Sequence, residues 1–540
     1  MDGMDLSLLA GGVAVVTGSG SVTGLGFGLA RQAAKMGMHV CISDVRQEAI
    51  DEAVATLQGE GHEGTIAGCA CDVTDFASVE ALLDFAKSSF GGAPVQFVGA
   101  NAGVIFPKTT TLSGTPEEWE ITYKVNVLGC FHTLRAFVPH LLEQDAPSAV
   151  EVTASMAGAI YGGTGPYGTS KLASLGIAEG LLSELAALEA SDKISVVTLC
   201  PGIVNTGLQA NSADINDIDE REGREGDAAS EATVAGFDAV WAAGMTNDYC
   251  ASQVFEHLGD GRFYCLLDGG SDTPESISAM ITHRYESMSS RRLSASPMSL
   301  AGANEESSLN GDGLDLNKLK GGVAVITGSG STKGLGFGLC RQAIKQGMHV
   351  VITDVRQDAI EEAVSQLRTE VAAEQLGVVV MGKSCDVTDY SSVEELLAFA
   401  QDSFGGAPIQ FVGGNAGVIF PTTTIISGTP EEWALTYKVN VLGLFHTLRA
   451  FVPVLLAQDE ASAVEVTASI AGISMGGSGP YGTSKLAALG IAEGLSSELM
   501  GAGATGKISM VSLCPVRVSF PLFFRCGRRP RDAWSDAASL

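Results

Sequence analysis

Residues 11–20 read GGVAVVTGSG, and residues 321–330 read GGVAVITGSG. In each copy an apolar run ends at a Thr-Gly pair, and two further glycines follow within a few residues. An apolar run that leads through glycines toward a helix predicts a buried strand followed by a tight loop at the strand's carboxyl end. Because the stretch returns 310 residues later, the chain is predicted to hold two copies of one strand–loop–helix unit.

The repeat extends well beyond this stretch. Asn101 and Asn415 lie 314 residues apart, as do Tyr167 and Tyr481. Four residues are therefore inserted in the second copy, and we place them around Leu367–Val380. A period this long indicates duplicated domains, and 540 residues are too many for one hydrophobic core.

Short runs rich in Val and Ile alternate with helical patterns in the first copy. Strand–helix alternation with continuously apolar strands predicts a parallel sheet covered on both faces. One helix begins at Pro116, because Thr115 and Glu118 form the pattern of a capping box, and the second copy repeats it from Thr429. Further helices are predicted over Ser78–Phe90 and near Ser230–Ala243. The predicted strands are Val13–Thr17, Met38–Ser43, Ile66–Cys71, Val95–Ala100, Ala149–Ala154, Ile194–Cys200 and Phe263–Leu267.

The two copies differ at their ends. After Pro201 the first continues through an acidic segment, a helix and a last strand, whereas the sequence after Pro515 is an unrelated basic tail. The second copy is therefore predicted to lack its last helix and strand, which leaves Ile508–Leu513 as an exposed apolar edge and predicts that this module binds cofactor weakly or needs a partner. The predicted organisation is a first domain, a linker, a shortened second domain and the tail, over residues 1–285, 286–317, 318–515 and 516–540.

Composition excludes several function classes. With 45% hydrophobic and 17% charged residues the chain is not generally disordered. A net charge of -30 disfavours nucleic acid as a partner, since phosphate binding needs clustered Lys and Arg. We see no secretory signal, no apolar run long enough to span a membrane, and no metal-ligand spacing among His and Cys. The sequence favours a cytoplasmic protein without a metal site or a membrane partner.

The glycine loop and the strand ends predict a dinucleotide site. Glycines let the backbone approach a pyrophosphate, and the following helix N-terminus supplies N–H groups. Asp44 ends the second strand, where a carboxylate binds a ribose diol and repels a 2′-phosphate, so NAD(H) is favoured over NADP(H). The alternative is a merely solvated Asp, and Lys333 leaves NADP(H) open for the second copy. The candidate residues are Gly18, Gly24, Gly26, Asp44 and Asp72, with Gly328, Gly334, Gly336, Asp354 and Asp386 in the second copy.

Tyr167 and Lys171 are the sharpest catalytic signal. A spacing of four places phenol and ammonium on one helix face, one turn apart. A free tyrosine has a pKa of about 10, and a neighbouring cation favours the phenolate and brings it toward neutrality. Ser155 follows a strand twelve residues upstream, where its hydroxyl is placed to polarise a carbonyl. Each feature alone also has a structural explanation, as a chance pair on a helix or a strand-ending serine.

The order of these motifs resembles the short-chain dehydrogenase/reductase family in its common form. The resemblance spans roughly residues 8–285 and again 318–515, and it implies two tandem Rossmann-fold α/β domains, each a doubly wound parallel sheet. The loop Ser19–Thr23 is two residues longer than the family's usual spacing, and Pro515 is not followed by glycine. The motif residues are Thr17, Gly18, Gly24, Gly26, Asn101, Ala102, Gly103, Asn126, Ser155, Tyr167, Lys171, Pro201, Gly202, Val204 and Thr206.

The resemblance also implies roles for these positions. Tyr167 is the general acid/base, Lys171 lowers its pKa and holds the nicotinamide ribose, Ser155 orients the substrate oxygen, and Asn126 holds a relay water. Asn101 to Gly103 wall the cofactor, and Pro201, Gly202, Val204 and Thr206 grip its nicotinamide end. In the second copy the matching residues are Asn415, Gly417, Asn440, Ser469, Tyr481 and Lys485.

The predicted function is an NAD(P)-dependent oxidoreductase acting on a small-molecule alcohol or ketone. The first alternative is a cofactor-binding regulatory or scaffold protein in which duplication has relaxed catalysis, above all in the second module. A sugar-nucleotide epimerase shares the Tyr–Lys pair but has a larger substrate domain than the sequence after Thr206 provides. The family's pairing helices, near Pro116 and Tyr167, further predict an intramolecular pseudo-dimer or a homo-oligomer.

Overall fold

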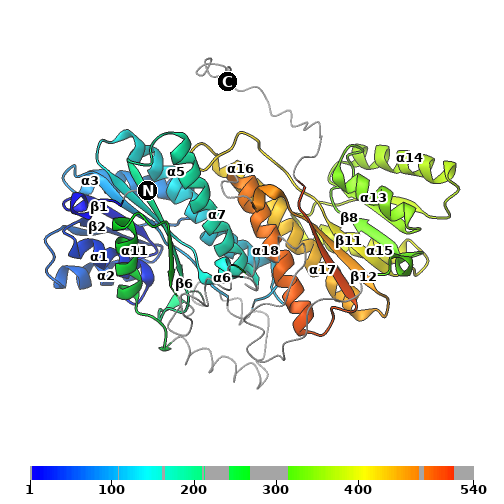
Figure 1. The fold of residues 1–540 in the computed structure, drawn as a ribbon, viewed down its shortest axis with the longest axis horizontal. Helices are drawn as coiled ribbons and strands as arrows, with labels where there is room; N and C mark the ends of the chain where they lie inside the picture. The colour runs from blue at the N-terminus through cyan, green and yellow to red at the C-terminus, as the bar shows by residue number, and fades with distance from the viewer. Residues whose placement is uncertain are drawn as a thin grey trace, which may run out of the picture.

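A computed structural model describes residues 3–106, 109–160, 165–208, 212, 242–267, 282, 314–473 and 479–515. These residues form two parallel β-sheets, one from each copy of the repeat. Figure 1 shows the sheets toward opposite ends of the molecule, with helices of both copies between them. We call the described parts of residues 3–267 the first module and those of residues 314–515 the second module. The predicted fold class, two tandem α/β modules with a shorter second one, is confirmed.

The first sheet has seven parallel strands in the order β3-β2-β1-β4-β5-β6-β7. The chain reverses its direction of winding between β1 and β4, and this switch point opens a crevice at the carboxyl ends of the strands. The strands are β1 (Val13–Thr17), β2 (His39–Asp44), β3 (Ile66–Ala70), β4 (Val95–Ala100), β5 (Ser148–Thr153), β6 (Ile194–Pro201) and β7 (Tyr264–Leu267).

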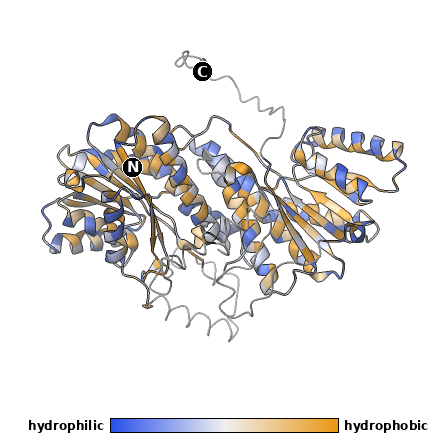
Figure 2. Cartoon of the chain, viewed as in Figure 1, coloured by the Kyte–Doolittle hydropathy of each residue, from blue (hydrophilic) through white to orange (hydrophobic). Residues whose placement is uncertain are grey.

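Helices cover both faces of this sheet, because its strands are apolar on both sides. Val13 and Val15 of β1 belong to one hydrophobic core, and Ala14 and Val16 belong to another. Figure 2 shows the central strands as largely hydrophobic. The helices are η1 (Leu6–Leu9), α1 (Leu25–Lys35), α2 (Gln47–Gly59), α3 (Phe76–Ser89), α4 (Pro116–Tyr123), η2 (Lys124–Leu128), α5 (Gly129–Glu143), α6 (Met156–Ala159), α7 (Gly165–Ala187) and α11 (Asn247–Gly259).

The second sheet repeats this topology with six parallel strands, in the order β10-β9-β8-β11-β12-β13. The strands are β8 (Val323–Ile326), β9 (His349–Asp354), β10 (Val380–Ser384), β11 (Ile409–Gly414), β12 (Ser462–Thr467) and β13 (Ile508–Leu513). The helices are η4 (Leu316–Leu319), α13 (Leu335–Lys345), α14 (Gln357–Ala373), α15 (Tyr390–Asp402), α16 (Pro430–Tyr437), η5 (Lys438–Leu442), α17 (Gly443–Ala457), η6 (Ile470–Gly472) and α18 (Gly479–Gly501).

Several local expectations match the structure closely. Thr115 and Glu118 form the predicted capping box at the start of α4, and Thr429 and Glu432 form it again at α16. The four inserted residues lengthen one helix, because α14 has 17 residues where its counterpart α2 has 13. The predicted strand limits differ from the observed ones by a residue at most at each end.

Other expectations differ from the structure or lie beyond it. The helix α11 was not predicted, although Cys250, Val254 and Leu258 recur at helical spacing and are buried. The helix predicted near Ser230–Ala243 and the acidic segment before it lie almost wholly outside the described residues. The short helix η4 begins inside the predicted linker, where Asp315 accepts a hydrogen bond from the Asn317 N–H and caps it.

The sheet edge predicted to be exposed is exposed in the structure. Within the described residues β13 pairs only with β12, whereas β6 in the first module is flanked by both β5 and β7. Val511 in β13 is 51% exposed, and Val197 at the same position of β6 is 0% exposed. The strand β13 therefore has the apolar sequence of a core strand, but within the described residues no strand pairs with its outer edge.

The two modules pack against each other through helices. The helices α7 and α18 lie side by side at the centre of the molecule (Figure 1). The rings of Trp119 and Phe445 stack with centroids 4.2 Å apart, and Phe131 and Trp433 repeat this contact at 4.1 Å. All four rings are fully buried, and one hydrophobic core runs through both modules.

One stretch of helix is longer and more apolar than the sequence analysis expected. Residues 430–457 form an uninterrupted run of helix with a mean hydropathy of 1.6, which is enough by length and composition to cross a membrane. However, 72% of its most apolar window is buried inside the protein, as in the core helix of a soluble fold. Its apolar residues pack on the sheet and helices of the second module, and Phe445 also reaches Trp119 of the first.

Candidate active site

A cavity of about 360 Å³ lies at the carboxyl ends of the first sheet's strands. This one cavity reaches from the end of β2, past the glycine loop after β1, to the side chains of α7. Among the predicted residues Gly26, Asn126 and Ser155 do not line it. The predicted residues that do line it are Gly18, Gly24, Asp44, Asp72, Asn101, Gly103, Tyr167, Lys171, Pro201, Gly202, Val204 and Thr206.

Close backbone contacts explain the glycines of the loop after β1. Gly18 has a φ of +63°, a conformation that side chains rarely adopt. A Cβ at Gly26 would lie 2.6 Å from the Gly18 carbonyl oxygen, and one at Gly20 would lie 2.7 Å from the Asp44 side chain. Gly24 caps α1 without a side chain, which leaves the N–H groups of the helix start facing the cavity region. This arrangement suits a pyrophosphate.

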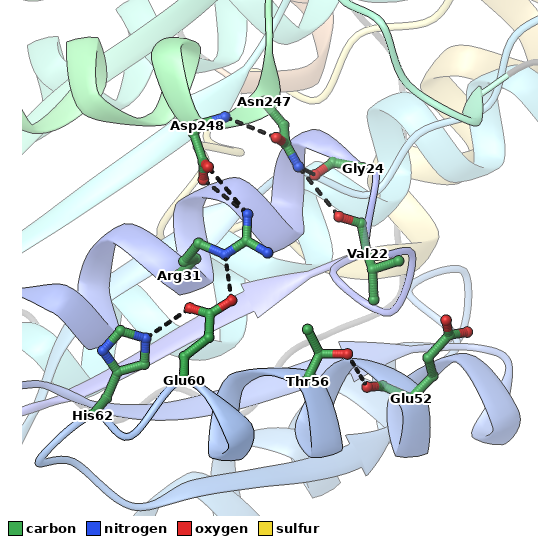
Figure 3. A network of polar contacts seen from close by, with 9 residues as sticks. All are labelled: Val22, Gly24, Arg31, Glu52, Thr56, Glu60, His62, Asn247 and Asp248. Carbon is green, nitrogen blue, oxygen red and sulfur yellow. Dashed lines mark hydrogen bonds and ion pairs between the residues drawn. The ribbon is translucent and has the colours of Figure 1, made fainter.

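Asn247, a residue distant in the chain that hydrogen-bonds to the glycine loop after β1, was not identified from the sequence. Figure 3 shows Asn247, the first residue of α11, whose side-chain amide donates to the carbonyl oxygens of Gly24 at 3.1 Å and Val22 at 3.4 Å. The next residue, Asp248, accepts two hydrogen bonds from Arg31 of α1. These contacts join residues more than 200 positions apart in the chain, so no local pattern indicates them.

Asp44, which the sequence predicts to bind a ribose, already has partners in the protein. Its carboxylate is 8% exposed and accepts hydrogen bonds from the Gly20 N–H and from the Arg46 N–H and Nε, all at 3.2 Å. The Arg46 side chain therefore sits at the same end of the cavity. Asp72 lines the cavity too, while its Oδ1 accepts from the Thr74 N–H and hydroxyl.

Tyr167 and Lys171 meet at the other end of the cavity. The Lys171 Nζ lies 5.9 Å from the centre of the Tyr167 ring and donates to the Thr153 carbonyl oxygen at 2.8 Å. Lys171 is 3% exposed, and this burial lowers its pKa to about 8. Burial raises the pKa of Tyr167, and a hydrogen bond with Ser155 opposes that rise. The phenol thus needs a further stabiliser of its charged form to act near neutrality, and the ammonium is the cation beside it.

Ser155 and Asn126 support the site from behind its lining. Ser155 contacts Tyr167, accepts from the Ala157 N–H at 3.1 Å and donates to the Pro201 carbonyl oxygen at 3.3 Å. Asn126 lies in the π-helical turn η2, and its Oδ1 accepts from the Val104 N–H at 2.8 Å. Its amide donates to the Val104 carbonyl and to Ser170, so the side chain itself fixes the β4–α4 connection. Its predicted role in a water relay stays a prediction.

Glu151 is a second residue that sequence reasoning missed. It lies in β5 beneath the cavity and is 0% exposed. Its Oε1 is 2.7 Å from the Thr153 hydroxyl, and its buried Oε2 has no hydrogen-bond partner in the described structure. Burial raises the pKa of Glu151 to about 8, although the Thr153 hydroxyl and the charge of Lys171 both oppose this. The available signal was a glutamate inside an apolar strand, repeated as Glu465 in β12.

We expect Glu151→Gln to remove a pH dependence of stability. A carboxyl whose pKa rises on folding contributes stability that is complete below its unfolded pKa, near 4.5, and is lost as pH rises through about 8. Relative to the variant, the natural protein should lose up to about 1.4 kcal/mol per pH unit across this window. Urea unfolding at several pH values measures it, with exposed Glu52→Gln as the control. Parallel pH profiles for the natural protein and Glu151→Gln would contradict the assignment.

The second module repeats the catalytic geometry. Lys485 donates to the Thr467 carbonyl oxygen at 2.7 Å and lies 5.9 Å from the centre of the Tyr481 ring. Ser469 contacts Tyr481, and Asn440 binds the Val418 backbone as Asn126 binds Val104. Burial lowers the pKa of Lys485 to about 8, as for Lys171.

The cofactor half of the second module is also repeated. Gly328 has a φ of +63°, Gly334 caps α13, and a Cβ at Gly336 would lie 2.5 Å from the Asn415 side chain. Asp354 accepts from the Arg356 N–H and guanidinium. Asp386 accepts from Thr388, and Gly417 lies against Asn440 and Lys485. The counterparts of Gly202 to Thr206 lie outside the described residues.

Comparison with known proteins agrees with this geometry. The profile of the short chain dehydrogenases matches residues 12–216 and again residues 322–523, which together are more than half of the chain. The chain belongs to the short chain dehydrogenase family. It carries the family's domain twice, and nicotinamide-dependent oxidoreduction is the general chemistry of this family.

Individual short chain dehydrogenases show how far the likeness extends. The 1-deoxy-11-beta-hydroxypentalenate dehydrogenase of Streptomyces avermitilis is 32% identical over 262 residues, which cover 48% of this chain and 86% of that protein. Dehydrogenase/reductase SDR family member 4 of Homo sapiens is 35% identical over 200 residues, 37% of this chain and 68% of that protein. The N-domain of a bacterial malonyl-CoA reductase, solved with NADP, has a TM-score of 0.62 at 16% identity and covers 94% of this chain and 91% of its own. This last likeness concerns the fold alone.

Proposed function

We propose that the first module transfers a hydride between a nicotinamide cofactor and a small-molecule alcohol or ketone, with Tyr167 as the general acid/base. The observation that carries this proposal is the single cavity that joins Asp44 at one end to Tyr167 and Lys171 at the other. A dinucleotide needs a site for its adenosine and a site for its reacting ring, and this cavity provides residues of the right kind for both.

Several described residues are of the kind that holds such a cofactor. The glycine loop presents backbone N–H groups for the pyrophosphate, and Asp44 lies where the adenosine ribose would bind. A Cβ at Gly103 would approach the Lys171 Nζ to 3.2 Å, so glycine keeps the cofactor wall open beside the ammonium. Pro201 and Gly202 line the far end. When bound, the nicotinamide supplies or accepts the hydride, and the protein supplies orientation and electrostatics.

The proton follows a short path on the protein's own residues. The Tyr167 hydroxyl donates its proton to the substrate oxygen in reduction and takes it back in oxidation. The Lys171 ammonium, whose Nζ lies 5.9 Å from the centre of the Tyr167 ring, stabilises the phenolate. Ser155 hydrogen-bonds the Tyr167 hydroxyl and holds the substrate oxygen in line with it.

We expect Asp44 to select NAD(H) over NADP(H). Its buried carboxylate would face the 2′-phosphate of NADP(H), and two like charges in contact cost several kcal/mol. In Asp44→Ser this repulsion is removed and no carboxylate at position 44 pairs with Arg46, so the preference should move toward NADP(H) by about a hundredfold. Steady-state kinetics with both cofactors measures this. The control is Asp354→Ser, the same change in the second module. The selection by Asp44 would be contradicted if the ratio of kcat/KM for NADH to kcat/KM for NADPH were as unchanged in Asp44→Ser as in this control.

A second candidate function is a cofactor-binding regulatory or scaffold protein. It is favoured by the open edge at β13 and by the absence of a glycine after Pro515 in the sequence. The repeated contacts of Tyr481 and Lys485 count against it as a description of the whole chain. This candidate predicts that NADH binds and that no carbonyl or alcohol is turned over.

The experiment that separates the two candidates is a substrate screen on the full chain. NADH binding is measured by fluorescence titration, and oxidation of NADH is followed against a panel of aliphatic, cyclic and aromatic ketones. Turnover of at least one ketone, absent in Tyr167→Phe, is the expected result. Binding without turnover of any carbonyl would transfer the assignment to the scaffold candidate.

The proposal extends to assembly and location. The contact between α7 and α18 supports an internal pseudo-dimer, in which one chain provides both halves of a pair. Light scattering would distinguish this single-chain particle from a homo-oligomer. We propose a cytoplasmic protein with a small-molecule substrate, and a net charge of -30 gives no support for nucleic acid as a partner.

A further inference from the structure

A loop of the first module is held by residues of the second. Residues 109–115, which we call the α4 loop, precede α4 and present two backbone N–H groups to the Glu498 carboxylate of α18. The distances are 2.8 Å from the Thr111 nitrogen and 3.0 Å from the Leu112 nitrogen. Arg449 of α17 donates its Nε to the Gly114 carbonyl oxygen at 3.1 Å. A glutamate and an arginine of one module thus bind both sides of a loop in the other.

The α4 loop also touches the helix that carries the catalytic pair. Gly165 begins α7 with a φ of +69°, and a Cβ there would lie 2.0 Å from the Thr109 carbonyl oxygen. The loop backbone is therefore in direct contact with the start of α7, and Tyr167 follows two residues later. A shift of the α4 loop would move the first turn of α7 and with it the Tyr167 hydroxyl.

The same contacts occur in the opposite direction. Glu184 of α7 accepts from the N–H groups of Ile425 and Ile426 at 2.8 and 3.0 Å, and Arg135 donates to the Gly428 carbonyl oxygen at 3.0 Å. This reciprocal pair gives an internal control, because each glutamate binds two backbone N–H groups at matching positions of the two loops. Only the loop bound by Glu498 lies beside Tyr167.

These hydrogen bonds are of the stronger kind. Each joins a carboxylate to two backbone N–H groups, and charge-assisted bonds are roughly twice as strong as neutral ones. Both glutamates are half-buried between the modules, and burial raises the pKa of Glu184 while the two N–H groups oppose that rise. A loop whose N–H groups lost such a partner would have to find water or a new conformation.

We propose that Glu498 is a positioning residue for the reaction of the first module, and that the second module serves as its built-in partner by holding the α4 loop against α7. The proposal rests on the proposed function, since it assumes that Tyr167 is the acid/base. In this proposal the second module has a structural role in the reaction of the first, whether or not the second module catalyses a reaction itself.

The test compares Glu498→Ala with Glu184→Ala in the full chain. Each variant removes the carboxylate that binds two backbone N–H groups of one loop, so both should lower the thermal midpoint by a similar amount. Only Glu498→Ala should lower kcat, by about tenfold to a hundredfold, because small displacements of reacting groups cost that much. The KM for NADH should be unchanged in both. Glu498→Gln, which keeps one acceptor oxygen, should recover part of kcat.

The outcomes separate this inference from the function on which it rests. Equal kcat losses in Glu498→Ala and Glu184→Ala, or no loss in either, would overturn the positioning role while leaving the oxidoreductase assignment intact. A loss confined to Glu184→Ala would place the reaction in the second module and overturn both. Absence of turnover in the natural chain would overturn the proposed function before any variant is compared.

Discussion

Lys171→Met is expected to lower kcat by about a hundredfold to ten-thousandfold, the range that general acid–base catalysis contributes. The substitution removes the cation beside Tyr167, whose pKa burial already raises. It also removes the donor to the Thr153 carbonyl oxygen, which fixes the position of the side chain between β5 and α7. Because the Thr153 carbonyl oxygen loses its donor, the thermal midpoint of the variant is measured alongside kcat, and the loss of kcat should persist at temperatures where the variant is fully folded.

The same residue predicts a pH dependence. Burial lowers the pKa of Lys171 to about 8, so the ammonium is present at neutral pH and disappears as pH rises through about 8. Turnover in the natural protein should therefore fall above this pH, apart from any effect on the substrate. Lys485→Met is the matched control, because Lys485 has the same burial and the same carbonyl contact in the second module. Equal losses in the two variants would contradict the assignment of catalysis to the first module.

Phe445→Ala is expected to cost about 3 to 5 kcal/mol of stability, as for other buried phenylalanines. Phe445 is 0% exposed, and its ring stacks on Trp119 of the other module with an angle of 11° between the planes. Its loss would leave a cavity in the core shared by both modules. Urea unfolding followed by tryptophan fluorescence measures the effect, since Trp119, one of four tryptophans, stacks on Phe445.

The control for Phe445→Ala is a surface change on the neighbouring helix. Leu435 of α16 is 44% exposed, and Leu435→Ala should change stability by no more than about 0.5 kcal/mol. Phe131→Ala should resemble Phe445→Ala, because Phe131 stacks on Trp433 in the same way. Equal, small effects for Phe445→Ala and Leu435→Ala would show that the modules do not pack through these rings in solution.

The parts of the fold that follow from local sequence were predictable. The strands are apolar runs buried on both faces, and the capping boxes at Thr115 and Thr429 are complete within four residues. The helix α11 was missed because its place depends on contacts with α1 and the glycine loop, far away in sequence. The apolar stretch at 430–457 was missed because Lys438 and Arg449 interrupt its apolar residues, so no unbroken apolar run marks it in the sequence.

In the candidate site too, residues in local motifs were predictable and residues that depend on distant contacts were not. Gly18, Asp44, Tyr167 and Lys171 were found from motif order, and the structure brings them to one cavity. Glu151 was overlooked because an acidic residue in a strand usually marks a solvent-facing position, and only the three-dimensional packing buries it. Glu498 was beyond the reach of a sequence argument, since its hydrogen bonds to Thr111 and Leu112 span almost 400 residues.

The most direct test of the account compares two tyrosine variants of the full chain, on the best ketone from the substrate screen. Tyr167→Phe removes the proposed acid/base of the first module, and Tyr481→Phe makes the same change in the second. The account predicts that kcat falls by about a hundredfold or more in Tyr167→Phe and stays close to that of the natural protein in Tyr481→Phe, with NADH bound by both. Similar losses in the two variants, or a loss confined to Tyr481→Phe, would contradict the claim that the first module carries the reaction.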